Sequence, residues 1–217
     1  MTPLLIVGAG GLARETLAAV LAGGEYKPVG YVDDNPALRG QTVEGLPVLG
    51  PIDSVADHPD AQVVICTAST RNQASRRTIA QRLQLPAERY ATVVHPMASI
   101  AAGTELGHGS VVLAFVAVTA PQRIGAHVVI MPHVTITHDD VINDHVTFAA
   151  RVALAGSVTV GEAAYLGQGA LVREGLTIGE GALVGMGSVV LRDVPPYEKW
   201  AGVPARPLTE ATARTSA

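Results

Sequence analysis

From Ile100 to Val190 an aliphatic or aromatic residue returns at every sixth position without a break. The series consists of Ile100, Leu106, Val112, Val118, Ile124, Ile130, Ile136, Ile142, Phe148, Leu154, Val160, Leu166, Val172, Ile178, Val184 and Val190. A helix places apolar residues about 3.6 positions apart and a half-buried strand places them about 2 apart, so this period fits neither element alone. It fits a three-sided coil in which each hexad is a short strand and a corner. We therefore predict a stack of about five coils around an aliphatic column.

A second position of the hexad is also restricted. The residue four places after each member of the series is mostly small or β-branched, and Gln122 and Asp140 are the clear exceptions. Glycine often follows the buried residue directly, where we expect a tight corner to favour a residue without a Cβ atom. These glycines are Gly107, Gly125, Gly161, Gly167, Gly179 and Gly185.

The first ninety residues have a different pattern, in which buried strands alternate with helices. A strand over 4–7, a glycine turn and a helix to about residue 21 are followed by strands ending near 32 and 67 and by a helix over about 70–83. This order predicts a small parallel sheet of the Rossmann-like α/β class. We expect an α/β domain over 1–90, a parallel β-helix over 91–208 and a disordered polar tail over 209–217.

The first strand ends in a glycine-rich turn, where Gly8, Gly10 and Ala13 match the pattern G-x-G-x-x-G/A and Gly11 lies between them. Asp33 and Asp34 follow about twenty-five residues later, where a ribose ligand would lie. The pattern fits a dinucleotide, another nucleotide or a tight turn without a ligand. About ninety residues form only half of a doubly wound sheet, which argues against NAD.

Composition excludes several classes of function. The net charge is -4 and no basic run is interleaved with aromatic residues, so we expect no nucleic-acid partner. The longest apolar run, 111–118, is far shorter than the ~20 residues needed to cross a bilayer, so no membrane partner is expected. The N-terminus lacks the features of a secretory signal, and the lone Cys66 lies in an apolar run, which favours a packed thiol in a cytoplasmic enzyme.

A short β/α domain with G-x-G-G, a His95–Pro96 junction and hexapeptide units such as those starting at Ile178 and Val184 resembles the sialic-acid and bacillosamine acetyltransferase family. The resemblance spans nearly the whole chain. It implies a left-handed coil, a nucleotide-sugar in the N-terminal domain and acetyl-CoA held by the coils between subunits of a homotrimer.

The resemblance implies that His138, followed by Asp139, is the catalytic base. An amine must lose a proton when it attacks a thioester, and an imidazole with an ordinary pKa near 6.5 accepts one at neutral pH. Gly156 lies 18 residues later, which is one coil further on and about 5 Å away. Its bare amide can approach an acetyl oxygen and stabilise the oxyanion, which is also the role that the family assigns to this place.

The same resemblance implies the residues that contact the two substrates. For acetyl-CoA these are Gly156, Gly167, Gly185, Pro204 and Arg206. For the nucleotide-sugar they are Gly8, Gly10, Gly11, Asp33, Asp34 and Thr147. Leu12 and Thr147 stand where many family members have histidine, so the sequence leaves the identity of the acceptor open.

The remaining histidines suggest no metal site. His133 lies five residues before His138, a spacing that resembles two zinc ligands of γ-class carbonic anhydrases, but Met97 stands where the third ligand would be. His127 and His145 are 18 residues apart and should stack, either as a surface pair or as contacts of an acceptor or a metal. His108 has no evident partner.

The sequence therefore predicts an acetyl-CoA-dependent N-acetyltransferase that acts on a nucleotide-activated amino sugar. An O-acyltransferase of a sialic acid, or of another small amine or hydroxyl compound, is the alternative within the same chemistry. A scaffold or a nucleotide-binding regulator without activity is the alternative from a different class, and it would not bind coenzyme A.

Overall fold

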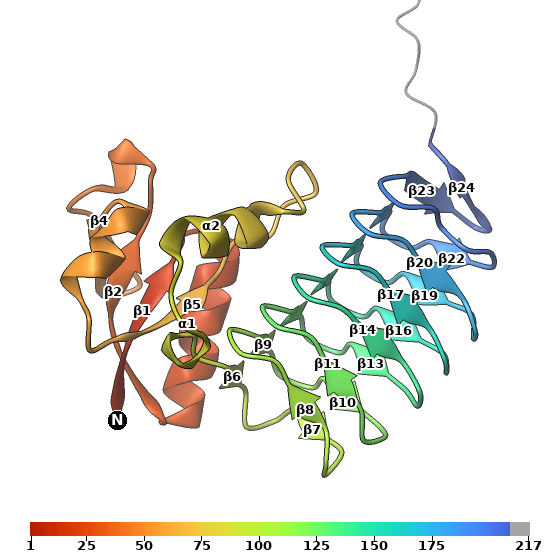
Figure 1. The fold of residues 1–217 in the computed structure, drawn as a ribbon, viewed down its shortest axis with the longest axis horizontal. Helices are drawn as coiled ribbons and strands as arrows, with labels where there is room; N and C mark the ends of the chain where they lie inside the picture. The colour runs from red at the N-terminus through yellow and green to blue at the C-terminus, as the bar shows by residue number, and fades with distance from the viewer. Residues whose placement is uncertain (209–217) are drawn as a thin grey trace, which may run out of the picture.

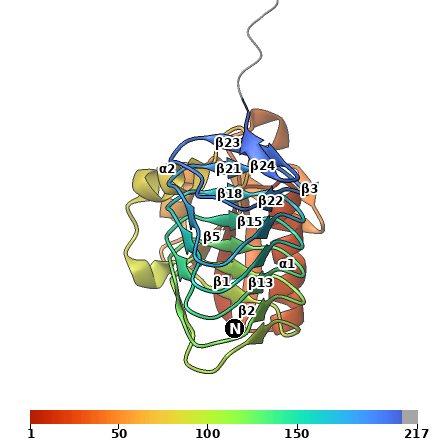
Figure 2. The same ribbon diagram turned by 90° about the vertical axis from the view of Figure 1, so that its right-hand side faces the viewer.

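The computed structural model describes residues 1–208, and the tail over 209–217 lies outside the described part. An N-terminal α/β domain is followed by a column of stacked coils that begins beside this domain and extends away from it (Figure 1). The column viewed end-on shows its coils overlying one another, with α1 and α2 of the N-terminal domain behind them (Figure 2). Among residues 1–208 no helix has the length and apolarity needed to span a bilayer.

The N-terminal domain contains a five-stranded sheet in the order β3-β4-β2-β1-β5. Its strands are β1 (Thr2–Val7), β2 (Tyr26–Val32), β3 (Thr42–Val43), β4 (Leu46–Gly50) and β5 (Gln62–Ile65). The helices are α1 (Gly11–Gly23), α2 (Ser75–Leu83) and the 3-10 turns η1 (Pro36–Leu38), η2 (Ile52–Asp57) and η3 (Ala87–Arg89). All strands except β3 run parallel, which confirms the predicted Rossmann-like arrangement.

Helix α2 begins five residues later than the sequence predicts. Residues 69–75 form successive turns instead, in which the Ser69 hydroxyl accepts a hydrogen bond from the Arg71 amide at 3.1 Å and Asn72 bonds back to the Ser69 carbonyl at 3.3 Å. Serine and asparagine stabilise such local turns because they offer the backbone an alternative to helix.

The coils form three parallel sheets in the orders β22-β19-β16-β13-β10-β7, β20-β17-β14-β11-β8 and β24-β23-β21-β18-β15-β12-β9-β6, in which β24 alone is antiparallel. The strands are β6 (Val93–Val94), β7 (Ser99–Ile100), β8 (Glu105–Leu106), β9 (Val111–Val112), β10 (Ala117–Val118), β11 (Arg123–Ile124), β12 (Val129–Ile130), β13 (Thr135–Ile136), β14 (Val141–Ile142), β15 (Thr147–Phe148), β16 (Ala153–Leu154), β17 (Thr159–Val160), β18 (Tyr165–Leu166), β19 (Leu171–Val172), β20 (Thr177–Ile178), β21 (Leu183–Val184), β22 (Val189–Val190), β23 (Lys199–Gly202) and β24 (Ala205–Pro207).

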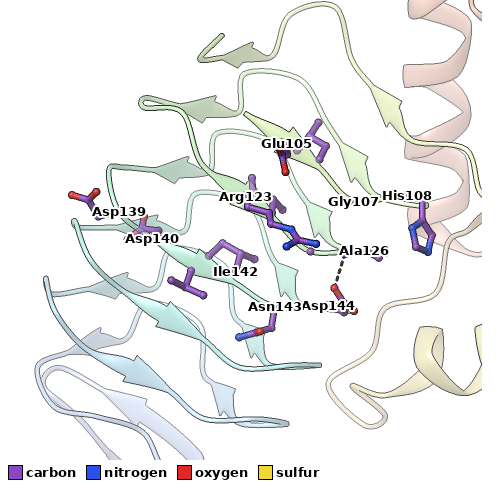
Figure 3. A pocket seen from close by; sticks show the side chains of 14 residues that line it. Glu105, Gly107, His108, Arg123, Ala126, Asp139, Asp140, Ile142, Asn143 and Asp144 are labelled. Atoms are coloured by element: carbon purple, nitrogen blue, oxygen red, sulfur yellow. Dashed lines mark hydrogen bonds between the residues drawn. The ribbon is translucent and has the colours of Figure 1, made fainter. Parts of the chain in front are cut away.

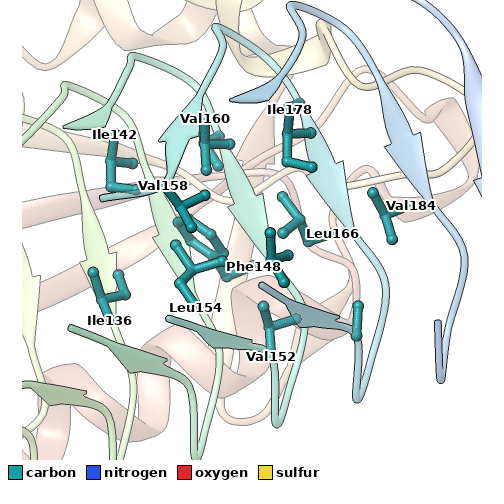
Figure 4. Close-up of a cluster of buried hydrophobic side chains, with 14 of the residues drawn as sticks. Ile136, Ile142, Phe148, Val152, Leu154, Val158, Val160, Leu166, Ile178 and Val184 are labelled. Atoms are coloured by element: carbon teal, nitrogen blue, oxygen red, sulfur yellow. The ribbon is translucent and has the colours of Figure 1, made fainter. Parts of the chain in front are cut away.

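From β6 to β22 paired strands of the coils are 18 residues apart, as Val118 is from Ile136, whereas β21 pairs with β23 at a spacing of 16 residues. The second residue of each strand from β7 to β22 points into the column, where Ile136, Leu154 and Phe148 belong to one buried cluster (Figure 4). Burying one such side chain contributes about 1.5–3 kcal/mol. The structure thus confirms the predicted parallel β-helix, and the six-residue period is the spacing of its inward-pointing side chains.

The predicted reason for the glycines after the buried residue is wrong. The left-handed corner residue is the third after the buried one, as at His127 with φ 54° and Asp139 with φ 60°. Gly161, directly after a buried residue, is needed for another reason, because a Cβ atom there would lie 2.9 Å from the Glu180 Cα of the next coil. Close approach of stacked backbones, rather than corner geometry, excludes a side chain at this position.

Gln122 and Asp140, the two polar exceptions in the hexads, are hydrogen-bonded to backbone amides of the coils. The carboxylate of Asp140 accepts hydrogen bonds from the amides of Thr137 at 2.9 Å and Val158 at 2.8 Å. One coil earlier, Gln122 accepts from the Asp140 amide at 3.2 Å. Burial raises the pKa of Asp140. These bonds hold the turn that follows β13, and this turn carries His138.

The N-terminal domain packs on one side of the first coils. Leu4 and Leu17, from β1 and α1, belong to the same buried cluster as Val111, Leu113 and Val129 of the coils. The outward face of the sheet that begins with β6, β9 and β12 is therefore covered, whereas no other part of residues 1–208 packs in this way on the outer faces of the other two coil sheets.

Candidate active site

His138 lies at an exposed corner of the coils, two residues after β13. Its Nδ1 is 2.8 Å from Asp139 Oδ2, and the two side chains are 66% and 77% exposed. The left-handed backbone of Asp139, which aspartate tolerates better than most residues, forms the corner itself. With Nδ1 bonded to the carboxylate, Nε2 is free to accept a proton.

Gly156 lies over this imidazole on the next coil. A Cβ atom on Gly156 would lie 2.6 Å from His138 Nε2, and the Ser157 amide donates to the His138 carbonyl at 3.0 Å. Within residues 1–208 the Gly156 amide itself has no hydrogen-bond acceptor. The structure therefore brings together a ring nitrogen and a free N–H group at one corner, as the 18-residue spacing predicts.

A groove of about 900 Å³ runs along the sheet of β8, β11 and β14 and reaches this corner at Asp139 (Figure 3). Glu105 and Arg123 line its floor, and Asp144 accepts a hydrogen bond from the Ala126 amide at 2.7 Å. This groove is wide and carries charges of both signs. Its lining includes Asp139 but not His138.

The glycine turn after β1 is built around Asp33. The carboxylate of Asp33 accepts from the Ala9 amide at 2.9 Å and from the Asn35 amide at 2.8 Å. Gly8 has φ 93°, and a Cβ atom there would lie 3.0 Å from the Cys66 carbonyl oxygen. Gly10 is the N-cap of α1 and provides no side-chain cap, so amides of the first turn are available to a phosphate.

Asp34, unlike Asp33, does not contact the glycine turn and bonds to Arg82 and the Ile52 amide. Its carboxylate pairs with Arg82 at 2.6 Å and accepts from the Ile52 amide at 3.0 Å. Arg82 also binds Asp53 at 2.7 Å. The hydrogen bond from Arg82 lowers the pKa of Asp34. Both Asp34 oxygens thus hold η2 and α2 against the sheet, in contrast to the predicted ribose contact.

A second cavity, of about 360 Å³, lies between the two parts of the chain. Glu15 of α1 and Thr70 form the N-terminal wall, and Tyr165, Gly167 and Gly185 belong to the wall of the coils. The remaining lining residues are mostly apolar: Met131, Pro132, Ala149, Ala150, Gln168, Leu183, Val184 and Met186. Two of the glycines predicted to contact coenzyme A therefore line one cavity, close to the N-terminal half of α1.

The hairpin of β23 and β24 forms the C-terminal end of the sheet that contains β18 and β21. Gly185 lies against Ala201, since a Cβ atom on Gly185 would be 2.8 Å from the Ala201 Cβ. Pro204 is in the turn of the hairpin, and the exposed Arg206 donates to the Ala205 carbonyl at 2.8 Å. Four of the predicted coenzyme A residues, Gly167, Gly185, Pro204 and Arg206, thus lie along one sheet, whereas the fifth, Gly156, lies at the His138 corner.

The predicted base and these residues do not meet within one chain. His138 and Gly156 follow β13 and β16, whereas Gly167 and Gly185 follow β18 and β21 of a different sheet. Thr147, predicted to contact the acceptor, is 2% exposed and accepts a hydrogen bond from Arg76 at 2.9 Å. It is a packing contact rather than a residue open to substrate.

The sequence did not indicate Arg76, which is 0% exposed. It lies in the polar helix SRRTIAQRL, where an arginine normally faces solvent, so no local pattern marks it. Its guanidinium donates to the carbonyl oxygens of Thr67 at 2.7 Å, His127 at 2.9 Å and Val146 at 3.1 Å, and to that of His145. Burial lowers the pKa of Arg76 to about 10.

His127 and His145 stack on adjacent coils, with ring centroids 5.2 Å apart and an interplanar angle of 9°. His108 and Tyr90 both pack edge-on against His127 and are tilted relative to each other, so His108 does have partners, contrary to the sequence expectation. His145 Nδ1 is 3.3 Å from Glu162, without hydrogen-bond geometry. Burial lowers the pKa of His127 to about 3 and also lowers that of His145.

His133 stacks on Phe115 with centroids 5.0 Å apart. Among residues 1–208 no group of three or more histidine, cysteine, aspartate or glutamate side chains is arranged to hold a metal ion. The histidines of the coils thus pack mainly against aromatic rings.

Residues 3–83 match the family described as the PglD N-terminal domain. A crystal structure of a His→Asn mutant of perosamine N-acetyltransferase from Caulobacter crescentus, in complex with CoA and GDP-perosamine, superposes with a TM-score of 0.86 at 29% identity, over 97% of this chain and 98% of that chain. The acetyltransferase domain of PglB from Neisseria gonorrhoeae gives 0.86 at 28% identity, over 96% and 100%.

The same PglB domain in complex with acetyl coenzyme A gives a TM-score of 0.84 at 27% identity, over 95% of this chain and 99% of that one. None of the curated proteins matches the chain. With a PglD N-terminal domain match over residues 3–83 and this likeness over almost its whole length, the chain is an acyl-CoA-dependent acyltransferase that is similar to hexapeptide-repeat sugar acetyltransferases.

Proposed function

We propose that this protein transfers the acetyl group of acetyl-CoA to the amino group of a nucleotide-activated amino sugar. The observation that carries the proposal is the corner at which His138 Nε2, oriented through Asp139, lies beside the free amide of Gly156. The similar perosamine N-acetyltransferase, which binds CoA and GDP-perosamine, supports the choice of substrates.

In the proposed reaction the lone pair of the sugar amine attacks the thioester carbonyl while His138 Nε2 removes a proton from the nitrogen. Asp139 stabilises the imidazolium through Nδ1, and the Gly156 N–H donates to the oxyanion of the tetrahedral intermediate. Collapse of this intermediate breaks the C–S bond, and the proton held by His138 passes to the thiolate of coenzyme A. Amide and free thiol are the products.

This route needs no acyl-enzyme. Cys66 lies in the N-terminal domain and is 3% exposed. Burial raises the pKa of its thiol to about 12, so it is not a nucleophile at neutral pH.

We further propose that residues 1–90 hold the nucleotide at Gly8, Gly10, Gly11 and the turn bonded to Asp33, and that residues 91–208 hold acetyl-CoA. His138 and the cavity of about 360 Å³ lie on different sheets of the prism, so the proposed site needs a second copy of the chain. A homotrimer would let the His138 corner of one copy face the cavity of the next. Because acetyl-CoA is an intracellular metabolite, the proposed reaction takes place in the cytoplasm.

O-Acylation is the second candidate. Leu12 packs into the core beside the glycine turn, so the turn has no imidazole of its own, and His138 could equally remove a proton from a hydroxyl group. The two candidates share the donor and the base, and they differ only in the acceptor.

Product mass analysis tests the proposal directly. The protein is incubated with acetyl-CoA and a panel of UDP-, GDP- and dTDP-linked amino sugars, with sialic acids as alternative acceptors. We expect at least one amino sugar to gain a single acetyl group, with release of one free thiol per turnover. Acetylation of sialic acids alone would favour the second candidate, and calorimetry that detects no coenzyme A binding would indicate a scaffold.

A further inference from the structure

Arg76 is the buried side chain of α2, and it carries its charge into the interface between the two parts of the chain. Among residues 1–208 no carboxylate lies within ion-pair distance of it. Its hydrogen bonds all go to neutral oxygen atoms, namely four carbonyls and the Thr147 hydroxyl. A buried cation without a counter-ion is costly and needs every hydrogen bond to be made.

None of the acceptors of Arg76 lines the cavity of about 360 Å³, but two of them are close in sequence to residues of its two walls. On the N-terminal side, Nη1 donates at 2.7 Å to the carbonyl of Thr67, three residues before Thr70, which lines that wall. On the coil side, Nη2 donates at 2.9 Å to Thr147, which begins β15 and leads to Ala149 in the opposite wall. The planar guanidinium of Arg76 therefore connects a segment next to one wall with a segment next to the other.

Thr67 also packs against the glycine turn. A Cβ atom on Gly8 would lie 3.3 Å from Thr67 Cγ2, and the Thr67 hydroxyl is 3.1 Å from that of Ser75, the residue before Arg76. The end of β5, the start of α2 and the turn after β1 thus form one packed unit. A shift of Arg76 would move this unit relative to the coils.

The arrangement depends on the shape of a guanidinium. Nε and Nη2 point to the coil carbonyls of His127 and Val146 while Nη1 points to Thr67, which needs donors fixed in a planar fork. A lysine ammonium is a compact point charge and cannot reach both sides from one place. Methionine has a similar unbranched stem and no donor.

We propose that Arg76 is a positioning residue of the acyl transfer, which sets the separation between the nucleotide-binding turn and the wall of the coils. The inference rests on the proposed function, in which the acceptor is held on one wall and the donor on the other. Arg76 touches neither reacting atom. It acts by holding the amine and the thioester at attack distance.

Steady-state kinetics of R76K and R76M, with coenzyme A binding measured by calorimetry, test the proposal. We expect kcat to fall about 100-fold in both variants, because a misplacement of about 1 Å costs a factor of this size. The dissociation constant of coenzyme A should stay unchanged, since the predicted contacts at Gly167, Gly185 and Arg206 do not involve Arg76. R77M is the matched control.

Arg77, the next residue of α2, pairs with Glu162 at 3.4 Å and Glu180 at 3.2 Å across the same interface, but it is 31% exposed. Exposed ion pairs contribute little, so kcat of R77M should remain close to wild type. T147V provides a milder test because it removes a single acceptor of Arg76, and we expect a kcat between wild type and R76K.

Wild-type kcat in folded R76K would overturn the proposal. A parallel loss of kcat and coenzyme A binding in the Arg76 variants would also overturn it, because Arg76 would then only support the fold. Should R76M fail to fold, R76K and T147V decide between these results. A wild-type protein that acetylates no acceptor would instead contradict the proposed function, so the two failures are distinguishable.

Discussion

The imidazole of His138 occupies the space that a side chain on Gly156 would fill. The two residues are 18 apart in sequence and lie on adjacent coils, and a Cβ atom on Gly156 would come within 2.6 Å of His138 Nε2. The ring therefore rests on a bare backbone, and its nitrogen lies close to a free amide. The proposed proton acceptor and the proposed oxyanion donor are therefore held by one register of the β-helix.

Replacing His138 by alanine should lower kcat by about 10²- to 10⁴-fold, the usual contribution of a general base. The side chain is 66% exposed, so the thermal unfolding temperature should hardly change. H133A is the control, since His133 lies on the same coil and stacks on Phe115. Initial rates and melting curves of the two variants check the prediction, and an H138A variant that turns over like wild type would contradict the assigned base.

The glycines of the coils should separate into two groups on substitution. In G156A the new methyl group meets the His138 ring, which can rotate away, so we expect a loss of activity with little loss of stability. In G161A the methyl group would meet the backbone at Glu180, which cannot move without opening the coil. Overpacking of this kind costs about 1–3 kcal/mol. Kinetics and chemical unfolding of both variants test this, and equal stability losses would refute the distinction.

Acid should destabilise the interface around His127. Burial lowers the pKa of His127 from 6.5 to about 3, so between these values the unfolded chain binds a proton that the folded chain does not. The contribution of His127 to the free energy of unfolding is fully present above pH 6.5. It decreases as the pH falls, by at most about 1.4 kcal/mol per pH unit.

H127N removes the titrating group, and asparagine tolerates the left-handed backbone of this corner. The free energy of unfolding, measured at a series of pH values from 7 to about 4, should fall less steeply in H127N than in wild type. H58N removes a histidine outside the stacked column and is the matched control. Equal slopes in H127N and wild type would show that His127 is not the acid-sensitive group.

Asp140 should be needed for the turn that carries His138. D140A leaves the amides of Thr137 and Val158 without an acceptor inside the column, which costs about 1–3 kcal/mol. D144A is the control, because the exposed amide it frees at Ala126 can bond to water. Melting temperature and kcat should both fall in D140A and stay near wild type in D144A. Unaltered kcat in D140A would show that the turn holds its shape without the carboxylate.

Much of the fold follows from local pattern. The hexads predict the coils and their register, because the inward side chains of stacked short strands must all be apolar. The same pattern misleads on the glycines after the buried residues, since the approach of the next coil, which excludes Cβ at Gly161, is not a property of the segment itself. Gln122 and Asp140 appear as exceptions in the sequence, and only the structure shows that they satisfy each other and the neighbouring amides.

For the candidate site, too, some features follow from sequence spacing and others depend on tertiary packing. A fixed 18-residue spacing is enough to place Gly156 over His138, and the strand-turn-helix pattern is enough to place Gly8, Gly10 and Gly11 at the start of α1. No local sequence pattern predicts which sheet of the prism faces the N-terminal domain. The packing of Leu4 and Val129 in one cluster decides it, and with it the separation of His138 from the cavity.

The sequence by itself determined the repeating unit, the register of the coils and the residue types at the His138 corner, because each depends on spacing along a regular backbone. The tertiary structure alone decided the burial of Arg76, the stacking of Tyr90 and His108 on His127, and the pairing of Asp34 with Arg82. These contacts join segments far apart in the chain, and their energies come from desolvation and hydrogen bonding that exist only once the two parts of the chain have docked.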